Sequence, residues 1–319
     1  MTQAPLVSVV VPTRNRHGLL RQTVTSIVAQ RDVAVEVVVV DDASDIPVPH
    51  WTGAGVVRVV RLHRHGERSV ARNAGIAAAR GRWIAFCDDD DLWAPTKVSH
   101  QLERAHRTGA RWIYSGEVVV DDQLDVLYGA PPPDPEAVVT GLRQFNAVPA
   151  GASNVVVEAS LLAKAGPFDA TLRRVEDWDM WLRLGRLATP ACVREPAVAY
   201  RARFRCGGNE AALMVDEPQL LAARHGIDVD RRAMLRRAGW SAMQAGQRLV
   251  AFGWYVRAVA AGDPMSAVRA VAALADPRVG TPGVYALVRR HADHAWMACA
   301  APWLSALRDG APTTEPAGG

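Results

Sequence analysis

Three of the places where carboxylates gather in this sequence of 319 residues hold residue types that could do chemistry. The densest is Asp88-Asp89-Asp90-Asp91, which follows the apolar run 83–87. Adjacent like charges repel and raise one another's pKa, so four neighbouring carboxylates oppose folding unless something compensates them. Hard oxygen ligands favour Mg²⁺ or Mn²⁺, and Mg²⁺ usually takes one or two carboxylates with phosphate oxygens and waters. The run therefore indicates a divalent-cation site, with an acidic turn that caps the next helix as the alternative.

The two other places are pairs of acidic residues. Asp41-Asp42 ends the β-branched run 35–40 and could accept hydrogen bonds from a nucleobase or a ribose, although an Asx-type turn is an equal alternative. Glu176-Asp177 precedes a helical pattern, where Asp177 could be a general base or only the N-cap of that helix. Asp179 points away from Asp177 once the helix has begun, so we expect it to have a structural or acceptor-contacting role.

The first 120 residues alternate short β-branched runs with helical patterns, which is typical of a parallel sheet covered by helices. Ligands in open sheets of this kind bind beyond the carboxyl ends of the strands, where the acidic clusters stand. We expect strands at 7–11, 35–40, 56–62 and 83–87, and helices at 68–80 and 96–107.

The remaining chain divides into a second αβ region and a helical region. Beyond about residue 211 the composition shifts to Ala, Arg, Leu and Trp at helical spacing, and residues 309–319 resemble a frayed tail. Before that point we expect two strands within 112–128, a proline-rich loop at 130–135, a strand at 153–157, helices at 159–165 and 178–187, and a short strand at 198–201.

Composition excludes several classes of protein. The net charge is +4, from 37 Lys+Arg and 33 Asp+Glu, which is too mild for a nucleic-acid coating protein, and no aromatic platform accompanies the basic stretch 58–72. The four cysteines form no Cys-x-x-Cys pair, which fits a reducing cytoplasm. The apolar stretch 295–307 is shorter than the roughly 20 residues that span a bilayer. We therefore expect a cytoplasmic protein with no nucleic-acid partner.

Five segments, in this order, resemble the motif set of family 2 glycosyltransferases, which have the GT-A fold. The resemblance covers about residues 5 to 205. It implies a mostly parallel, Rossmann-like α/β sheet flanked by helices, with a C-terminal α-helical region added. The segments are Val7-Ser8-Val9-Val10-Val11-Pro12-Thr13-Arg14-Asn15-Arg16, Val38-Val39-Val40-Asp41-Asp42-Ala43-Ser44, Ala71-Arg72-Asn73-Ala74-Gly75, Asp88-Asp89-Asp90-Asp91-Leu92-Trp93 and Glu176-Asp177-Trp178-Asp179-Met180-Trp181-Leu182-Arg183.

The resemblance implies an inverting transfer of a sugar from a nucleotide diphosphate sugar, by default a UDP-sugar, with Mn²⁺ or Mg²⁺ at an Asp-x-Asp element. The nucleoside pocket would be lined by Pro12, Thr13 and Asn15. Asp42 would accept from the base, and Arg72 would lie near the diphosphate. The chain has neither the Gln-x-x-Arg-Trp element nor the membrane helices of processive relatives, so we expect transfer of a single sugar.

The same resemblance assigns roles to the carboxylates. Asp90 would contact the metal, and Asp89 would approach the ribose or the sugar. Asp88 opens the Asp-x-Asp pattern and is a weaker candidate for donor binding. Asp177 would be the catalytic base that accepts the proton of the acceptor hydroxyl.

One departure from the family concerns the segment after Tyr200-Arg201. Many relatives have a histidine shortly after this point that helps to close the metal or diphosphate site, and here the segment has none. We expect Arg201, Arg203 and Arg205 to grip the diphosphate instead. Gly207-Gly208 would then act as the hinge of a closing loop.

The expected organisation is a nucleotide-sugar-binding half at 1–120, an acceptor-binding and catalytic-base half at 121–210, and a helical region with a disordered tail at 211–319. The acceptor would be a glycan, a lipid-linked glycan, a small molecule or a peptide. The C-terminal helices could associate with the inner face of the membrane, form a homodimer or pack on the catalytic domain. Two rival functions are a non-catalytic sugar-nucleotide-binding scaffold and a nucleotidyltransferase of related fold, although the Gly-rich signature of the latter is missing after the first strand.

Overall fold

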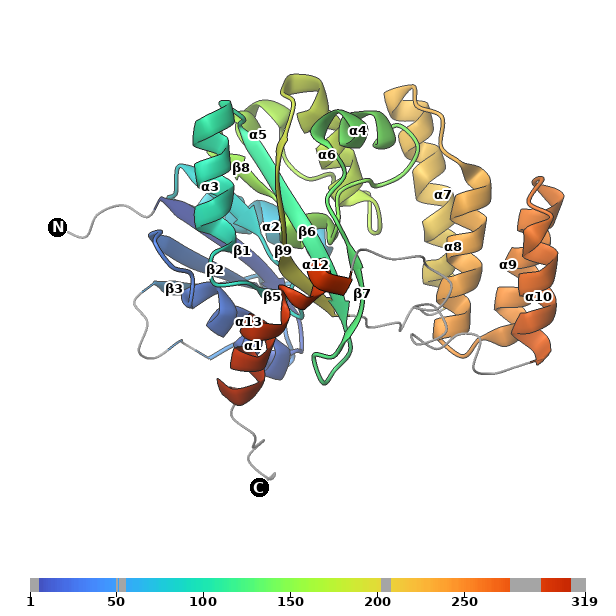
Figure 1. Cartoon of the computed structure of the whole chain (residues 1–319), viewed down its shortest axis with the longest axis horizontal. Helices are drawn as coiled ribbons and strands as arrows, with labels where there is room; N and C mark the ends of the chain where they lie inside the picture. Colours follow the sequence, from blue (N-terminus) through green and yellow to red (C-terminus); the bar gives the residue numbers. More distant parts are fainter. Residues whose placement is uncertain (1–5, 50, 52–55, 202–207, 276–293, 311–319) are drawn as a thin grey trace.

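The computed structural model describes residues 6–49, 51, 56–201, 208–275 and 294–310. Within these residues one nine-stranded sheet has helices on both faces, and a group of further helices lies beside it (Figure 1). The strand order is β3-β2-β1-β4-β8-β6-β9-β5, and β7 pairs with β6. The predicted α/β class, with a mostly parallel sheet and a C-terminal helical region, is confirmed.

The first half of the sheet is parallel, as the sequence predicts. β1 (Val7–Thr13) lies between β2 (Val35–Asp41) and β4 (Trp83–Phe86), and β3 (Val57–Arg61) pairs with β2. The β-branched strands are buried on both faces because alternate residues enter two different cores, one against α1 (His17–Val28) and one against α2 (Glu67–Ala78). The carboxyl ends of β1, β2 and β4 therefore meet at one edge.

The second half of the sheet is mixed, because β6 pairs in parallel with β9 and antiparallel with β7 and β8. Its elements are β5 (Leu92–Trp93), α3 (Lys97–Thr108), β6 (Trp112–Val120), β7 (Val126–Ala130), α4 (Pro135–Gly141), the 3₁₀ turn η1 (Gly151–Asn154), β8 (Val156–Glu158), α5 (Ala159–Ala165), α6 (Glu176–Leu187) and β9 (Ala191–Arg201).

Several elements differ from the sequence-based expectation. The last strand, β9, is 11 residues long and begins at Ala191, because it continues past Pro196 at a point where its register with β6 shifts. The strand expected at 153–157 divides into η1 and β8. The helix expected from residue 178 begins at Glu176, and α4 was not predicted.

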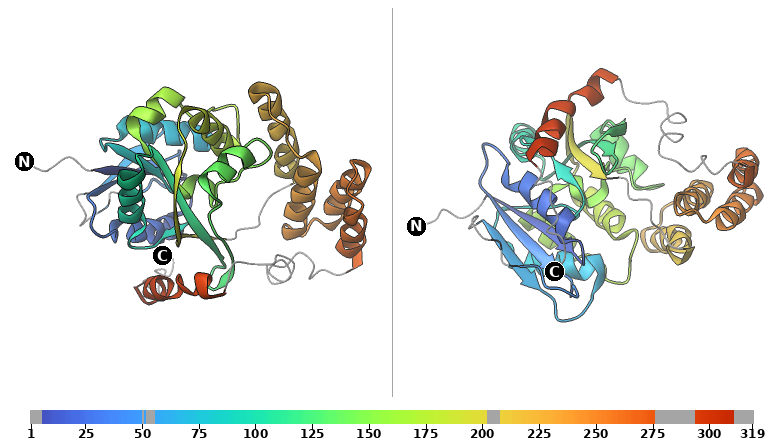
Figure 2. Two further views of the ribbon diagram at one scale, coloured as in Figure 1. Left: turned by 45° about the horizontal axis from the view of Figure 1, so that its top comes forward. Right: turned by 90° about the horizontal axis from the view of Figure 1, so that it is seen from below.

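The C-terminal helices form two separate groups (Figure 2). The first group lies beside the sheet domain and contains α7 (Gly208–His225), α8 (Arg231–Gln244), α9 (Arg248–Ala260) and α10 (Met265–Ala275). The second group, α12 (His294–Ala298) and α13 (Ala301–Gly310), packs on the strands, where Ala300 and Leu304 contact a core cluster that includes Val118 and Val120. None of the described helices is both long enough and apolar enough to cross a membrane. Residues 311–319 of the expected tail lie outside the described residues.

The first helical group is attached to the sheet domain by α7. Glu217 accepts hydrogen bonds from the backbone N–H groups of Arg173 and Arg174, at 2.9 and 2.7 Å. His225 Nε2 lies 2.7 Å from Asp179 Oδ1. Asp179 therefore has a structural role, which is one of the two roles that the sequence predicted for it. His225 is bound to Asp179, which lies outside the aspartate run.

Candidate active site

The loops after β1 and β4 are joined by direct side-chain contacts. Thr13 Oγ1, at the end of β1, donates a hydrogen bond of 2.6 Å to Asp89 Oδ2. Arg16 Nη1 contacts Asp89 Oδ1 at 3.1 Å and Asp90 Oδ2 at 3.0 Å. Thr13 and Asp89, which the sequence assigned to neighbouring parts of a nucleotide, thus lie side by side.

The loop after β1 also contacts the loop after β2. Asn15 has a left-handed backbone with φ of 56°, and its side chain exchanges hydrogen bonds with Asp45 at 3.0 and 2.8 Å. The Asn15 backbone N–H donates to Ser44 Oγ at 3.0 Å. Pro12 is buried in β1, where it pairs with Val40 of β2. The next residue, Thr13, is the last of the strand, and the loop follows it.

Asp41 and Asp42 have different surroundings. Asp41 is 1% exposed and accepts from the backbone N–H groups of Ser44 and Val48, so it makes the turn that the sequence offered as an alternative for the pair. Burial opposes its ionisation, but these hydrogen bonds and the nearby Arg61 lower the pKa of Asp41 below its usual value. The next residue, Asp42, reaches the start of α2.

Asp42 is held by two donors beside the N-terminus of α2. Its Oδ2 lies 2.7 Å from His65 Nδ1, and its Oδ1 accepts the Gly66 N–H at 2.7 Å. Its side chain remains 7% exposed at the edge where the loops after β1 and β2 meet. The backbone N–H of Asp42 also donates to the Thr13 carbonyl at 2.9 Å, so the structure brings Asp42 beside Thr13, and its contact with a base stays a prediction.

The aspartate run alternates between buried and partly exposed side chains. Asp89 and Asp91 are 5% and 1% exposed, whereas the side chains of Asp88 and Asp90 are 30% and 15% exposed. Burial, and then the charge of Asp90, raise the pKa of Asp89 to about 6. The N-cap of α3 is Thr96, without a side-chain cap, so the alternative that the run caps the next helix is wrong.

Asp91 anchors the run to the interior. It accepts a hydrogen bond from Ser153 Oγ and another from the Arg201 backbone N–H at 3.0 Å. Ser153 Oγ in turn accepts the Asp88 N–H at 2.9 Å. Arg201 was expected to grip the diphosphate, but it is 4% exposed, and its guanidinium donates to the backbone carbonyls of Asp90 and Asp122 and to Gln22 Oε1, so it is engaged within the protein. The expected roles of Arg203 and Arg205, and of the hinge at Gly207-Gly208, fall on or beside residues 202–207, which lie outside the described residues.

The partly exposed carboxylates are those that a divalent cation could use. Across the described ranges no group of three His, Cys, Asp or Glu side chains could hold a metal ion by itself. Asp88 and Asp90 still fit a cation that takes one or two carboxylates and fills its shell with phosphate oxygens and water. At present Asp88 binds Arg72 and Asp90 binds Arg16, so cation binding would weaken these two ion pairs.

Arg72 links the aspartate run to α6. Its guanidinium is 1% exposed and donates to Asp88 Oδ1 at 2.7 Å and to Glu176 Oε1 at 2.8 Å. Burial disfavours the charge, but the two carboxylates outweigh it and raise the pKa of Arg72. We call Asp88, Arg72 and Glu176 the buried ion-pair chain. Because both ends of the guanidinium are engaged, Arg72 positions Asp88, and its contact with the diphosphate stays a prediction.

Asp177 follows directly after the buried ion-pair chain. It is the second residue of α6, whose N-cap is Val175 without a side-chain cap, so the N-cap interpretation of Asp177 is wrong. Its Oδ2 accepts a hydrogen bond from Asn146 Nδ2 at 2.9 Å. Burial, and then the neighbouring Glu176, raise the pKa of Asp177 to about 6. A partly buried carboxyl with this pKa is mostly ionised at neutral pH and can still accept a proton.

Sequence reasoning missed several residues of the site. Gly151 has φ of +50°, and a Cβ at this position would lie 2.5 Å from Asp177 Oδ2. Asn146 and Gly151 stand in a loop region with no periodic pattern, so no sequence signal marks them. Arg68 is one turn before Arg72 on α2, and spacing of four residues places both on one face of the helix.

The charge of Arg68 acts on the same carboxylates as that of Arg72. Desolvation opposes its ionisation, yet Asp88 and Glu176 raise the pKa of Arg68 well above its usual value. Arg68 therefore lies close enough to the aspartate run and to Glu176 for its charge to act on both. Trp178 and Trp181 of α6 are 2% and 0% exposed and belong to the hydrophobic core.

Comparison with known proteins agrees with this geometry. Residues 8–131, which include the ends of β1, β2 and β4, match the family model of glycosyl transferase family 2. Succinoglycan biosynthesis protein ExoO of Rhizobium meliloti (strain 1021) is 40% identical over 128 residues, 39% of this chain and 35% of ExoO. Residues 8–131 of this chain thus resemble glycosyl transferase family 2. The chain spans about a third of the length of ExoO in that match.

Two further relatives extend the comparison. An uncharacterized glycosyltransferase of Rickettsia typhi (strain ATCC VR-144 / Wilmington) is 24% identical over 226 residues, which cover 69% of this chain and 71% of that protein. A putative teichuronic acid biosynthesis glycosyltransferase, TuaG of Bacillus subtilis (strain 168), is 33% identical over 117 residues, 35% of this chain and 46% of TuaG.

Solved structures show that the chain has a GT-A-like fold. S. aureus TarS 1-349 in complex with UDP-GlcNAc aligns with a TM-score of 0.55 at 16% identity, over 95% of this chain and 90% of that one. The mannosyltransferase PcManGT from Pyrobaculum calidifontis, in complex with GDP-Man and Mn²⁺, aligns with a TM-score of 0.53 at 19% identity, over 90% and 86%. At these identities the likeness concerns the fold.

Proposed function

We propose that this chain is a non-processive, inverting glycosyltransferase that moves a sugar from a nucleotide diphosphate sugar, preferably a UDP-sugar, to a hydroxyl of a glycan, lipid-linked, small-molecule or peptide acceptor. The match of residues 8–131 to the model of glycosyl transferase family 2 supports the reaction class. The observation that carries the proposal is the buried ion-pair chain, because it fixes α6 relative to the aspartate run. Asp177 is thereby held beside the surface to which β1, β2 and β4 lead.

Asp177 is the proposed general base. Its carboxylate takes the proton of the acceptor hydroxyl as that oxygen attacks the anomeric carbon. The bond from the anomeric carbon to the diphosphate oxygen breaks at the same time, and the nucleotide diphosphate leaves with the bonding electrons. Attack from the face opposite the leaving group inverts the anomeric centre. Asn146 donates to Asp177 Oδ2 and so orients the carboxylate.

The diphosphate would lie between the aspartate run and α2. Asp90, with Asp88 as the weaker candidate, would hold Mn²⁺ or Mg²⁺, which when bound stabilises the negative charge that develops on the leaving group. Arg68 is proposed to contact the same phosphates, because it shares a helix face with Arg72 and its charge is felt at Asp88. Arg72 keeps Asp88 in place from behind.

The nucleoside would lie over the loops after β1 and β2. Pro12, Thr13 and Asn15 would line its pocket, Asp42 would accept from the base, and Asp89, hydrogen-bonded to Thr13, would approach the ribose or the sugar. In this arrangement one edge of the sheet holds the nucleotide, and the N-terminus of α6 faces the acceptor.

A thermal-shift screen tests the donor site. Purified chain is heated with UDP, GDP, dTDP and CMP, each with and without Mn²⁺, and the screen is repeated on Asp90→Ala. A ligand that binds only the folded state adds about 2.7 kcal/mol of stability at a hundredfold excess over its dissociation constant. We expect one nucleoside diphosphate, UDP, to raise Tm in a Mn²⁺-dependent manner, and Asp90→Ala to remove that dependence. If no nucleotide shifts Tm under any condition, the transferase proposal is wrong.

A further inference from the structure

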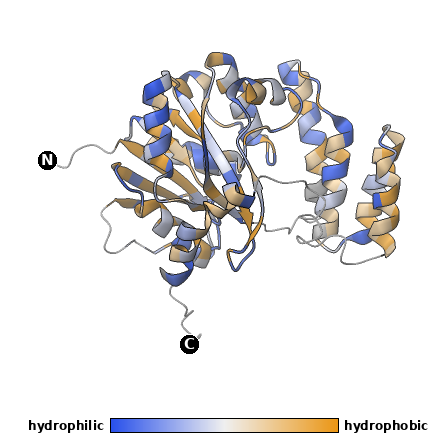
Figure 3. Cartoon of the chain, viewed as in Figure 1, coloured by the Kyte–Doolittle hydropathy of each residue, from blue (hydrophilic) through white to orange (hydrophobic). Residues whose placement is uncertain are grey.

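Helices α9 and α10, the last two helices of the first C-terminal group, expose large apolar side chains. Met265, Val268, Val271 and Leu274 recur every three residues along α10 and are 61%, 63%, 66% and 45% exposed. Leu249 and Val256 of α9 are 79% and 46% exposed. We call these six residues the apolar face. Figure 3 shows that α10 is predominantly apolar along its length.

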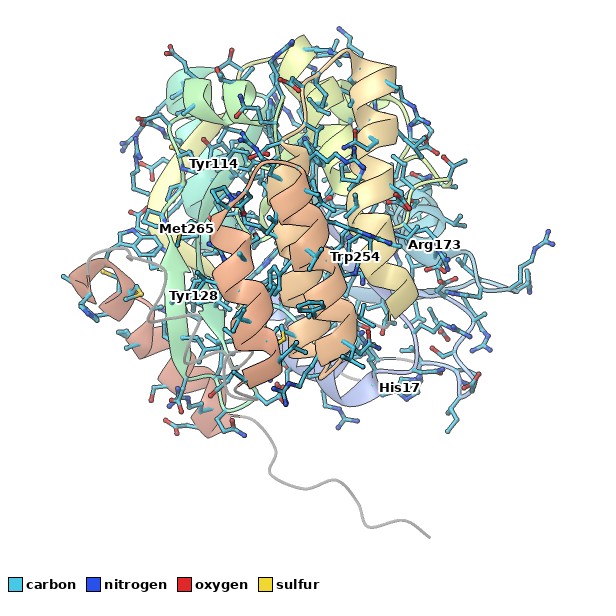
Figure 4. The ribbon with its side chains drawn as sticks, turned by 90° about the vertical axis from the view of Figure 1, so that its right-hand side faces the viewer. His17, Tyr114, Tyr128, Arg173, Trp254 and Met265 are labelled. Carbon is cyan, nitrogen blue, oxygen red and sulfur yellow. The ribbon has the colours of Figure 1, made fainter. Side chains whose placement is uncertain are left out.

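Packing explains which side of α10 is covered. Ser266, Ala270 and Ala273 are buried at spacings of four and three residues, so they form one face of the helix, and α10 packs on α9. In Figure 4 these two helices form the layer nearest the viewer, with Trp254 and Met265 labelled. The valines of α10 therefore lie away from the protein, where exposure of a run of apolar side chains marks an interaction surface.

Charge is concentrated in the same helices. Residues 231–275, from the start of α8 to the end of α10, contain seven arginines and one aspartate, a net charge of +6. The rest of the chain holds 30 Lys+Arg and 32 Asp+Glu, a net charge of −2. The positive charge of the whole protein thus resides in the segment that exposes the apolar face.

We propose that α9 and α10 dock on an anionic lipid bilayer, with the apolar face inserted at the level of the headgroups. Apolar side chains on helices of net positive charge are what an interfacial segment presents to such a surface. A second copy of this chain would bring another charge of +6 against the first, which disfavours a homodimer through this face. An anionic membrane supplies the opposite charge and an apolar interior to the same surface.

Vesicle co-sedimentation tests the proposal. The full chain is mixed with vesicles of phosphatidylcholine alone, or of phosphatidylcholine with an equal amount of phosphatidylglycerol. We expect sedimentation with the anionic vesicles, release at high salt because surface charges are screened, and no sedimentation with phosphatidylcholine alone. Failure to bind the anionic vesicles, or equal binding to both, would overturn the proposal.

Two double variants separate the apolar and the charged contributions. Val268→Asp with Val271→Asp should weaken vesicle binding at least about tenfold, because two charges enter the apolar face. Arg231→Gln with Arg257→Gln should weaken it by about fivefold for each arginine removed. Leu187→Asp is the matched control, because Leu187 is 48% exposed on α6, outside the apolar face, and this variant should bind as wild type does. Unchanged binding in both double variants would contradict the proposal.

Two further measurements exclude unfolding and dimerisation as explanations of the vesicle-binding results. If the valine double variant loses its thermal transition, Leu249→Asp takes its place, since Leu249 is the most exposed side chain of the apolar face. Light scattering should show a monomer in solution, and a dimer that Val268→Asp with Val271→Asp dissociates would overturn the proposal. Nucleotide binding should be equal in all these variants, so failure here leaves the proposed transferase activity intact.

Discussion

Single residues of the same type have different roles at the N-terminus of α6. Asp177 keeps a carboxyl near the loops at the sheet edge, contacts Asn146 and has a raised pKa. Two residues later, Asp179 is 2% exposed and binds Arg183 and His225. The difference lies in their partners: Asp179 is bound by the side chains of Arg183 and His225, whereas Asp177, the proposed base, accepts hydrogen bonds from the uncharged Asn146 side chain and the Trp178 backbone N–H.

The first prediction concerns pH. Because Asp177 must be ionised to accept a proton and its pKa is about 6, kcat/KM should fall as pH decreases through about 6 and level off above it. The measurement is a pH-rate profile of donor turnover between acidic and mildly alkaline pH, with folding monitored at each point. A rate that is constant or increases as pH falls through this range would show that Asp177 is not the base.

The second prediction concerns Gly151. Gly151→Ala should lower turnover, because its Cβ would lie 2.5 Å from Asp177 Oδ2 and must displace the carboxylate. Gly109→Ala is the control, since Gly109 also has positive φ, of +70°, but open space around it. Both variants should lose about 1–2 kcal/mol of stability from the left-handed backbone. Equal turnover in the two variants would mean that Gly151 does not position Asp177.

At this scale the sequence predicted the residues that stand in motifs and missed those that support them. Thr13 and Asp89 were assigned to the nucleotide site, and they are hydrogen-bonded to each other. The contact of Asn146 with Asp177 crosses 31 residues, and no local pattern reports such a contact. The same limit applies to Ser153, which links Asp91 to the Asp88 backbone.

Whole elements were predicted well where hydrophobic patterns are continuous. β1, β2 and β4 are runs of buried apolar residues, and their expected positions are confirmed. β9 was predicted at four residues and has 11, because Arg194, Glu195 and Pro196 interrupt the apolar pattern while pairing with β6 continues on both sides. Long-range pairing thus overrides a local pattern that is typical of a loop.

The third prediction tests how the elements are held together. Arg72→Met should lower the free energy of unfolding by about 3–5 kcal/mol, because it leaves Glu176 and Asp88 without their buried cation. Arg107→Met breaks the exposed pair with Glu103 and should cost less than about 1 kcal/mol. Chemical denaturation of both variants measures the difference, and similar losses would show that the buried ion-pair chain is not a structural link between α2, α6 and the aspartate run.

At the scale of the molecule, composition predicted a helical region after the sheet but not its division into two groups. Trp296 of α12 lies against the bare backbone of Gly116 and Gly129, where any Cβ would come within 3 Å of its ring or of Met297. α12 returns to the sheet through contacts between residues that are more than a hundred positions apart in the sequence. The expected division at residues 120 and 210 stays a prediction, although strands from both sides of residue 120 join one sheet.

The fourth prediction tests the return of the C-terminal helices. Leu304 is 2% exposed and belongs to the same core cluster as Leu92 and Val118, so Leu304→Ala should destabilise the protein by about 2–5 kcal/mol. Leu249→Ala removes the same atoms from a side chain that is 79% exposed and should change stability little. Thermal unfolding of the two variants gives the comparison, and an unchanged Tm for Leu304→Ala would contradict the packing of α13 on the sheet.

The central claim is that Asp177 is the base of a sugar transfer, and the most direct measurement is turnover of the donor by Asp177→Asn. Water can replace the acceptor, so hydrolysis of the nucleotide sugar identified by thermal shift is the readout. We expect Asp177→Asn to lower the rate of hydrolysis by about 10²–10⁴-fold and to keep the nucleotide-induced rise in Tm. A variant that hydrolyses the donor as fast as wild type would contradict the account, and a wild type that binds the nucleotide without ever hydrolysing or transferring the sugar would show that the chain is a sugar-nucleotide-binding scaffold.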